Sequence, residues 1–174
     1  MIRKAVFLFT ICFLLFPAHA HFMSRIWPQK GLAQNEIGSP AAKHRILVAG
    51  TSSAFRDTVL FRLMKKFQDD SVYFRIINLK NLSVRDPGKW DAVLLVNRCV
   101  AWDYDNRVKK FIRNHHDSAN LIVFTTSGDP EGCIPEKKMP EKPNVDGYSS
   151  ASAPEKIAPA VEALYQLLVK HLQR

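Results

Sequence analysis

Residues 44–67 constrain the fold more than any other stretch of this sequence. They begin with a short apolar run, Ile46–Ala49, of the kind that forms a fully buried strand. A glycine and a small hydroxylated turn, residues 51–53, follow, and the chain then continues with apolar side chains at helical spacings of three and four. A strand, a small-residue turn and a helix form the opening unit of an α/β sheet, and the start of such a helix favours anions. We therefore interpret the turn as a phosphate-binding loop, or one descended from it.

The rest of the chain alternates apolar runs with helical patterns. Further strands are expected at residues 72–79, 92–96, 120–125 and 144–148, and helices at residues 103–115 and 152–171. Because the strands are apolar rather than alternating, we expect a parallel sheet that is covered on both faces. Ligands of such sheets bind beyond the carboxyl ends of the strands. The loops expected to form a site are therefore those at residues 50–54, 97–103 and 125–132.

The N-terminus has the features of an export signal. Two cations precede an apolar stretch of about 12 residues, which is too short for the roughly 20 residues of a membrane-spanning helix, and Ala18-His19-Ala20 fits a cleavage site. We expect residues 1–20 to be a signal peptide, residues 21–43 a flexible N-terminal tether and residues 44–174 the folded domain of a periplasmic or extracellular protein. The alternative is a protein anchored in the membrane by an uncleaved N-terminal segment.

The chain of 174 residues is basic, with a formal net charge of +9. Its lysines and arginines are scattered along the sequence rather than interleaved with aromatic residues, so binding to nucleic acid is not indicated. The charge would suit an anionic membrane surface, an acidic partner, or simply a solvated face.

Three motifs and the order of the expected elements resemble the flavodoxin-like family over about residues 44–172. The motifs are Arg-Ile-Leu-Val-Ala-Gly-Thr-Ser-Ser, Lys-Trp-Asp-Ala-Val-Leu-Leu-Val and Leu-Ile-Val-Phe-Thr-Thr-Ser-Gly-Asp. The resemblance implies a three-layer α/β sandwich whose sheet has five parallel strands in the order 2-1-3-4-5, with helices on both faces. It also implies FMN as cofactor, a function in electron transfer or flavin-dependent oxidoreduction, and a redox partner protein or quinone. The basic charge of this chain indicates that such a partner is acidic or associated with a membrane.

Carried over residue by residue, the resemblance assigns the cofactor to the loops after the first, third and fourth parallel strands. The first loop would hold the phosphate, and the other two would flank the flavin ring, with Trp102 as the stacking side chain. The complete set of implied cofactor-binding residues is Thr51, Ser52, Ser53, Arg56, Asn97, Arg98, Trp102, Thr126, Ser127, Gly128 and Asp129.

The expected phosphate loop departs from the family's pattern, because Ala54 and Phe55 stand where the family has a glycine-containing turn. Arg56 could compensate by pairing with a phosphate, or it could pair with Asp57 or be solvated. Two classes of function therefore stay open. One is an exported flavin-binding electron carrier or oxidoreductase, and the other is a flavodoxin-like module without cofactor that serves in binding or assembly.

Cys99 and Cys133 lie in the expected loops after the third and fourth parallel strands. In an exported protein they could form a disulfide, because both loops should emerge at the same edge of the sheet. They could also be two unrelated thiols or a redox-active pair. Their spacing is not that of a zinc site, and no catalytic residue or metal ligand is indicated.

Overall fold

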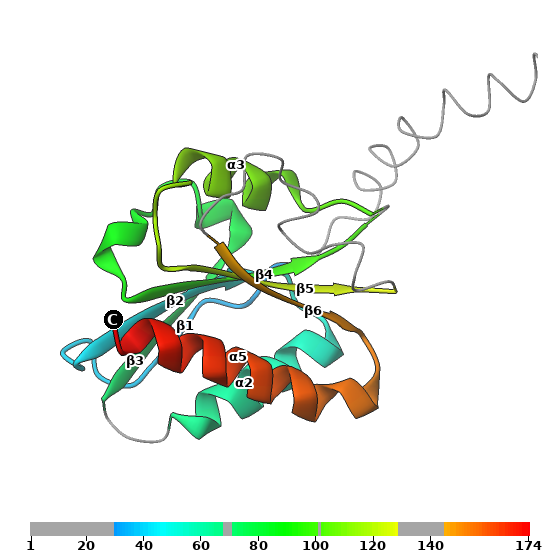
Figure 1. Ribbon diagram of the computed structural model, residues 1–174, viewed down its shortest axis with the longest axis horizontal. Helices are drawn as coiled ribbons and strands as arrows, with labels where there is room; N and C mark the ends of the chain where they lie inside the picture. The colour runs from blue at the N-terminus through cyan, green and yellow to red at the C-terminus, as the bar shows by residue number, and fades with distance from the viewer. Residues whose placement is uncertain (1–29, 68–70, 101, 129–144) are drawn as a thin grey trace, which may run out of the picture.

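One six-stranded sheet organises the structure, a computed structural model that describes residues 30–67, 71–100, 102–128 and 145–174 (Figure 1). The strands lie in the order β1-β3-β2-β4-β5-β6. Their bounds are β1 Asn35–Ile37, β2 His44–Gly50, β3 Val72–Asn78, β4 Ala92–Arg98, β5 Leu121–Ser127 and β6 Val145–Ala151.

Five of the strands run parallel and one does not. When only the parallel strands are numbered along the chain, β3, β2, β4, β5 and β6 have the predicted order 2-1-3-4-5. The prediction that the sheet has five strands was wrong, because β1 adds an antiparallel strand beside β3. All three residues of β1 are exposed, so no apolar run or alternation marks this strand in the sequence.

The segment before β2 packs on the sheet, whereas the sequence predicted a flexible tether at residues 21–43. Leu32 is buried, and its N–H donates to Gly50 O at 3.0 Å. Gly31 forms an isolated bridge with Thr51, and β1 then runs along β3. The domain therefore includes residues 30–43 and begins earlier than the predicted boundary at residue 44. The predicted signal peptide lies outside the described residues.

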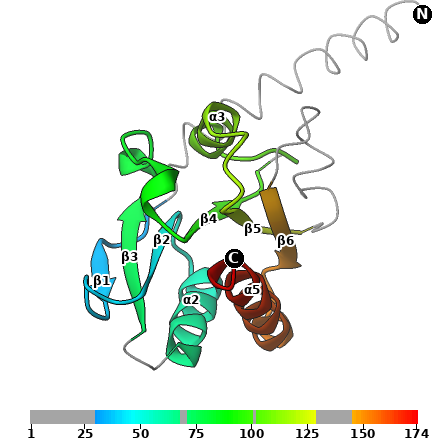
Figure 2. The ribbon, with the colours of Figure 1, turned by 60° about the vertical axis from the view of Figure 1, so that its left-hand side comes forward.

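Three α-helices of the described residues cover the two faces of the sheet. α2 (Ala54–Lys66) and α5 (Ile157–Leu172) lie on one face, and α3 (Asn106–Asn114) lies on the other (Figures 1 and 2). α3 and α5 begin three to five residues later than the sequence predicted, and a short 3-10 turn at Pro154–Lys156 precedes α5. Among the described residues, no helix is both long and apolar enough to span a bilayer.

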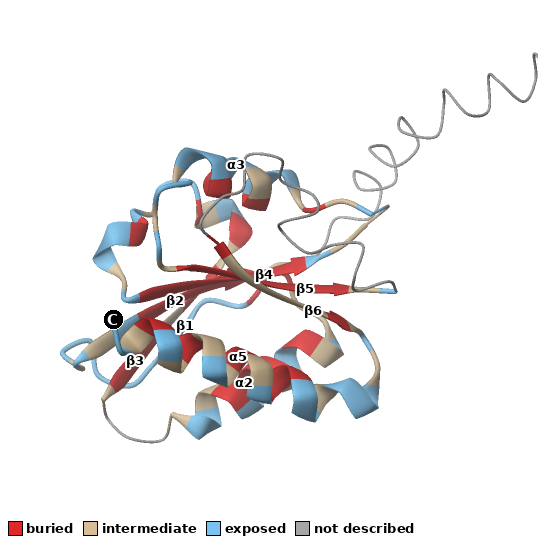
Figure 3. Cartoon of the chain, in the orientation of Figure 1, coloured by how far each residue is buried: buried red, intermediate tan, exposed pale blue. Residues whose placement is uncertain are grey.

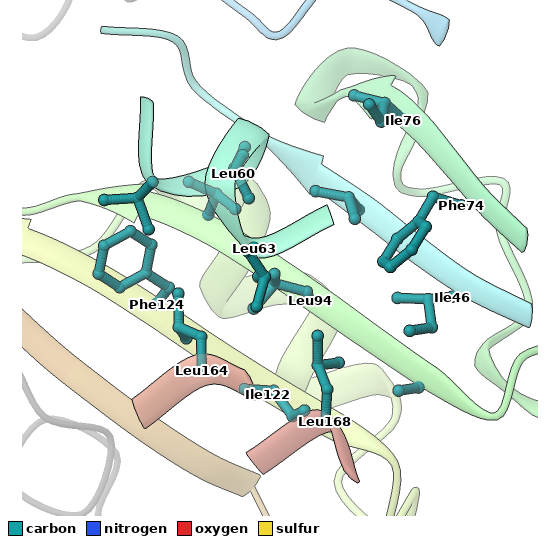
Figure 4. Packing of buried hydrophobic residues seen from close by; sticks show 14 of the residues in the cluster. Ile46, Leu60, Leu63, Phe74, Ile76, Leu94, Ile122, Phe124, Leu164 and Leu168 are labelled. Carbon is teal, nitrogen blue, oxygen red and sulfur yellow. The ribbon is translucent and has the colours of Figure 1, made fainter. Parts of the chain in front are cut away.

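The sheet separates two hydrophobic cores, which explains why its central strands are apolar on both sides. The larger core joins one face of the sheet to α2 and α5 through side chains such as Leu63, Phe124 and Leu164 (Figure 4). The smaller core joins the other face to α3 through residues such as Val108 and Ile112. Buried positions accordingly run along the central strands and the inner sides of the helices (Figure 3). Both cores end at the carboxyl edge of the strands, where polar residues begin.

Candidate functional site

A transverse row of polar side chains crosses the carboxyl edge of the sheet on the face that α3 covers. Asn97 of β4 is in register with Thr125 of β5, which is in register with Ser149 of β6. Thr51 directly follows β2 and extends the row. Gly50 and Val96 are in register, so the next residues, Thr51 and Asn97, lie beside each other. Since side chains alternate along a strand, these residues share a face with the smaller core. We call these four residues the polar row.

Within the part of the chain that the structure describes, every member of the polar row has a buried side-chain atom without a hydrogen-bond partner. The atoms are Thr51 Oγ1, Asn97 Nδ2, Thr125 Oγ1 and Ser149 Oγ. Leaving one such group unsatisfied costs about 1–3 kcal/mol, and native structures contain few of them. Four of them side by side at the carboxyl edge of the strands are therefore costly for folding, and such groups call for a partner such as an ordered water or a ligand.

The amide of Asn97 is held in one orientation. Its Oδ1 accepts the backbone N–H of Asp105 at 3.1 Å, so the unpartnered atom is the donor Nδ2. Asp105 is in turn fixed as the N-cap of α3 and forms an ion pair with Arg107 at 2.5 Å. The polar row therefore contains one oriented donor, Asn97 Nδ2, beside three hydroxyls that can donate or accept.

Arg56 lies beneath the turn after β2 instead of pointing to solvent. The residue is 3% exposed. Its Nε donates to Thr51 O at 2.9 Å, its Nη2 to Ser52 O at 2.8 Å, and its Nη1 to Thr126 Oγ1 at 2.8 Å. Hydrogen bonds from a charged group contribute about 1.5–3 kcal/mol each. The turn is therefore organised around an internal cation.

The surroundings of Arg56 lower its pKa, but the guanidinium stays protonated. Burial, followed by repulsion from Arg98, lowers the pKa of Arg56 to about 10, against an opposing effect of Asp57. Because this pKa is still well above 7, the guanidinium stays charged at neutral pH. The buried cation is stabilised by backbone carbonyls and a hydroxyl rather than by a direct ion pair.

The backbone N–H groups at the start of this turn already have acceptors. Thr51 N donates to Val96 O at 3.0 Å, and Ser52 N donates to Lys30 O at 2.7 Å. The second of these bonds comes from the segment before β1, which crosses the turn. These two amides are therefore satisfied within the protein.

Two of the three hydroxyls of the turn, those of Ser52 and Ser53, are also engaged. Ser52 Oγ donates to the Asp57 carboxylate at 2.7 Å, and Ser53 Oγ accepts the N–H of Arg56 at 3.3 Å as the N-cap of α2. This arrangement does not fit the phosphate group that the sequence resemblance implied. A phosphate needs converging donors, and here the carbonyls converge on an arginine while a carboxylate takes up a hydroxyl.

Trp102 projects from a tight turn after β4. Val100 and Asp103 exchange backbone hydrogen bonds of 3.1 and 3.2 Å, which close the turn around Trp102. The residue is 60% exposed and has a φ of 59°, an uncommon conformation for a bulky side chain. Strain of this kind often accompanies a functional position. Trp102 thus presents an aromatic face at the edge that contains the polar row.

The other residues implied by the resemblance fall into three groups. Thr126 is buried on the opposite face from the polar row and bonds Arg56, while Ser127 is half-buried with an unpartnered hydroxyl. Arg98 and Gly128 are exposed at the ends of β4 and β5. Asp129 lies outside the described residues. Their roles toward a cofactor stay predictions.

Cys99 directly follows β4, and its N–H donates to Thr126 O at 2.9 Å. The residue is disulfide-bonded. Cys133, the partner expected from the sequence, lies outside the described residues, so the pairing of these two cysteines stays a prediction. Among the described residues, no cluster of three or more potential ligands could hold a metal ion.

Sequence reasoning missed half of the polar row. Thr125 and Ser149 were not among the predicted site residues, although Thr125 directly follows the apolar run of β5. The signal that could have identified them is the phase of the strands. Asn97 and Thr125 each lie two positions after an apolar residue of the smaller core, Leu95 and Val123, and therefore continue the same face of the sheet.

Comparisons with solved structures place this architecture among known folds. The metal-soaked Flv1 flavodiiron core from Synechocystis sp. PCC6803 matches with a TM-score of 0.53 and 12% identity over 76% of this chain. The chain spans 37% of the length of that protein. The apo form of an NADH:FMN oxidoreductase, EMOB, matches with a TM-score of 0.51 and 13% identity, over 75% of this chain and 89% of its own.

A flavodoxin from the domain Archaea also matches, with a TM-score of 0.48 and 12% identity over 73% of this chain and 98% of its own. No family model matches the sequence, and no curated protein is similar enough in sequence to match. The parallel strand order, the helices on both faces and the two matches above a TM-score of 0.5 agree with one another. The chain therefore has the flavodoxin-like fold.

Proposed function

We propose that this protein is a flavodoxin-like redox protein that holds a flavin at the carboxyl edge of its sheet. The polar row carries the proposal, because its unpartnered groups lie where this class of sheet binds ligands. The matching structures described as a flavodiiron core and an NADH:FMN oxidoreductase support a flavin as the class of ligand.

In this proposal the chain's own residues bind and orient the ligand. Asn97 Nδ2 donates to an acceptor on the ligand, and the hydroxyls of Thr125 and Ser149 donate or accept as the ligand requires. Trp102 offers an exposed aromatic face for stacking against a planar ring. A bound flavin would supply the electron-transfer chemistry, for which the protein sets access and surroundings.

FMN is the flavin that the sequence resemblance implied, but the turn after β2 does not fit its phosphate. Arg56 lies beneath the turn and bonds its carbonyl oxygens, and Thr51 N and Ser52 N are already bonded within the protein. We therefore assign the recognition of the flavin to its ring and its polyol chain, and no role to a phosphate in that turn.

We further propose that the protein acts outside the cytoplasm, with its N-terminal segment as signal or anchor, and exchanges electrons with a redox protein or a quinone. The net charge of +9 supports a partner that is acidic or associated with an anionic membrane. Fractionation of cells that express the full chain tests the location. Recovery of the protein in the cytoplasm alone would contradict it.

A second candidate function is a binding or assembly module without cofactor. The observation that favours it is the hydrogen bonding of the turn after β2. Arg56 donates to Thr51 O and Lys30 O accepts Ser52 N–H, so the protein itself bonds groups that a ligand could otherwise bind. Under this alternative the polar row would serve a ligand of another class, and no flavin would bind in any phosphorylation state.

Quenching of flavin fluorescence on titration with the protein separates the two functions. The proposal predicts saturable binding that weakens by about tenfold in Thr125→Val, which keeps the shape of the side chain but removes one hydroxyl of the row. Thr58→Val, on the second turn of α2, is the matched control and should bind as the wild type does. Absence of binding, or equal binding by Thr125→Val, would contradict the proposed site.

A further inference from the structure

We propose that Arg56 replaces the phosphate of the ligand in the turn after β2, so that the edge accepts a flavin without phosphate, such as riboflavin, about as well as FMN. This inference rests on the proposed function for its class of ligand. It makes Arg56 a specificity-determining residue, although the arginine itself bonds the protein and not the flavin.

The polarity of the turn is reversed relative to a phosphate-binding loop. Such a loop directs backbone N–H groups toward a shared anion. Here Thr51 O and Ser52 O accept hydrogen bonds from a shared cation, the guanidinium of Arg56. The third acceptor, Thr126 Oγ1 on β5, ties the arginine to the sheet. A phosphate at this position would meet carbonyl oxygens instead of donors.

The segment before β1 closes the turn from the other side. Lys30 O accepts Ser52 N–H at 2.7 Å, and Leu32 N–H donates to Gly50 O at 3.0 Å. Gly31 lies so close to Asn78 that a Cβ built at Gly31 would meet Asn78 Nδ2 at 1.8 Å. The crossing segment is therefore held on both sides of the turn and occupies the acceptor position at Ser52 N.

A negative charge completes the exclusion of phosphate. Asp57, in the first turn of α2, accepts the hydroxyl of Ser52 at 2.7 Å and is exposed at the mouth of the turn. A carboxylate beside the turn repels a phosphate dianion, and it occupies the Ser52 hydroxyl that could otherwise donate to the phosphate. The helix N-terminus, which ordinarily attracts anions, is thus countered by a fixed anion of the protein.

Affinity should then depend little on whether the flavin is phosphorylated. In a donor-lined loop, removing a phosphate loses several charge-assisted hydrogen bonds, each of which changes affinity by about tenfold. In this protein the N–H groups of Thr51 and Ser52 and the hydroxyl of Ser52 are already bonded within the protein, so fewer donors of the turn remain for a phosphate. We expect the dissociation constants of riboflavin and FMN to agree within about threefold.

The test uses the full chain and two independent measurements. The first compares dissociation constants for riboflavin and FMN under the same conditions. The second follows the Arg56 Nε–H and Ser52 backbone amide signals by NMR while inorganic phosphate is added. The expected results are nearly equal flavin affinities and no saturable shift of either signal.

The outcomes separate this inference from the proposed function. FMN binding more than about tenfold tighter than riboflavin, or a saturable shift of the Arg56 signal with phosphate, would overturn the inference and leave flavin binding in place. If neither flavin binds, the proposed function fails, and the phosphate titration still decides whether the turn is closed.

A variant tests the role of Arg56 directly. Arg56→Lys keeps the charge, but one ammonium cannot hold three acceptors in the same fixed fork geometry, so the turn should loosen and the preference for FMN over riboflavin should rise by at least about threefold. Arg62→Lys, an exposed position on the same helix, is the matched control and should keep the wild-type ratio. An Arg56→Lys protein that is folded, with the wild-type ratio, would show that Arg56 does not set the preference.

Discussion

Arg56 Nη1 donates to Thr126 Oγ1 at 2.8 Å, which joins the first turn of α2 to the end of β5 across 70 positions of sequence. The bond fixes a charged side chain inside the turn where related sheets bind anions. The same edge contains the polar row, on the opposite face of the strands. On one face of the sheet, this edge is closed by the hydrogen bonds of Arg56. On the other face it carries the unpartnered groups of the polar row.

Thr126→Val should destabilise the protein, because it leaves a buried guanidinium N–H of Arg56 without an acceptor. The expected loss in the free energy of unfolding is about 1–3 kcal/mol. Urea denaturation of the full chain measures it, with Thr58→Val as the control for a threonine outside the edge. A loss no greater than that of the control would show that the bond contributes nothing to the closed turn.

Thr125→Val should have the opposite effect on stability, although it changes the neighbouring residue in the same strand. The Thr125 hydroxyl is buried and unpartnered, so its removal relieves a desolvation cost. We expect the free energy of unfolding without ligand to stay constant or to rise by up to about 1 kcal/mol, while flavin binding weakens. Denaturation and fluorescence titration of one preparation measure both. A clear loss of stability would mean that the hydroxyl has a partner in solution.

Trp102→Gly should stabilise the turn after β4 and weaken flavin binding. The left-handed conformation at this position costs a non-glycine residue about 1–2 kcal/mol, which glycine avoids. Trp102→Ala is the matched control, because it removes the ring but keeps the strain. Equal stability of the glycine and alanine variants in thermal unfolding would contradict the assigned strain.

Acid should weaken the packing of α5 on β6 through His171 and Asp146, which lie 2.9 Å apart. Burial lowers the pKa of His171 below 6.5, although Asp146 opposes this shift. The unfolded state therefore binds a proton more readily, and the free energy of unfolding should fall as the pH decreases through the window below about 6.5.

Protonation of Asp146 should cause a second loss of stability at lower pH. Burial alone would raise the pKa of Asp146, but hydrogen bonds from Lys170 and His171 outweigh it, so that the pKa lies below 3.8. Stability from this carboxylate is present above 3.8 and is lost as the pH falls through its lower folded value. Denaturation at a series of pH values measures both steps. His171→Leu should flatten the upper step and reduce the lower one, because it also removes one of the hydrogen bonds that lower the pKa of Asp146. An unchanged upper step in His171→Leu would assign it to another group.

The sequence was sufficient to predict the parallel strands of the sheet but not the antiparallel outer strand β1. The central strands β2, β4 and β5 are apolar on both faces. Each is therefore a continuous apolar run that can be recognised without knowing how the strands pair. β1 has three exposed residues and depends on pairing with β3, which no local pattern encodes. Its prediction would have required knowledge of the tertiary fold.

The candidate site was predicted in part for the same reason. The hydroxylated turn at residues 51–53 is a local feature, and the sequence placed it correctly at the start of α2. Its closure depends on contacts with Lys30 and Thr126, which are distant in sequence, and on which way Arg56 turns. The polar row likewise exists only once three strands are in register.

The most direct test of the account is the visible absorption spectrum of the purified full chain after reconstitution with riboflavin or FMN and desalting. The proposed flavin site predicts that the flavin bands persist with either ligand, at close to one flavin per chain, and weaken in Thr125→Val but not in Thr58→Val. A protein that is folded and loses both flavins completely on desalting, with no saturable binding in titration, would contradict the proposed flavin site.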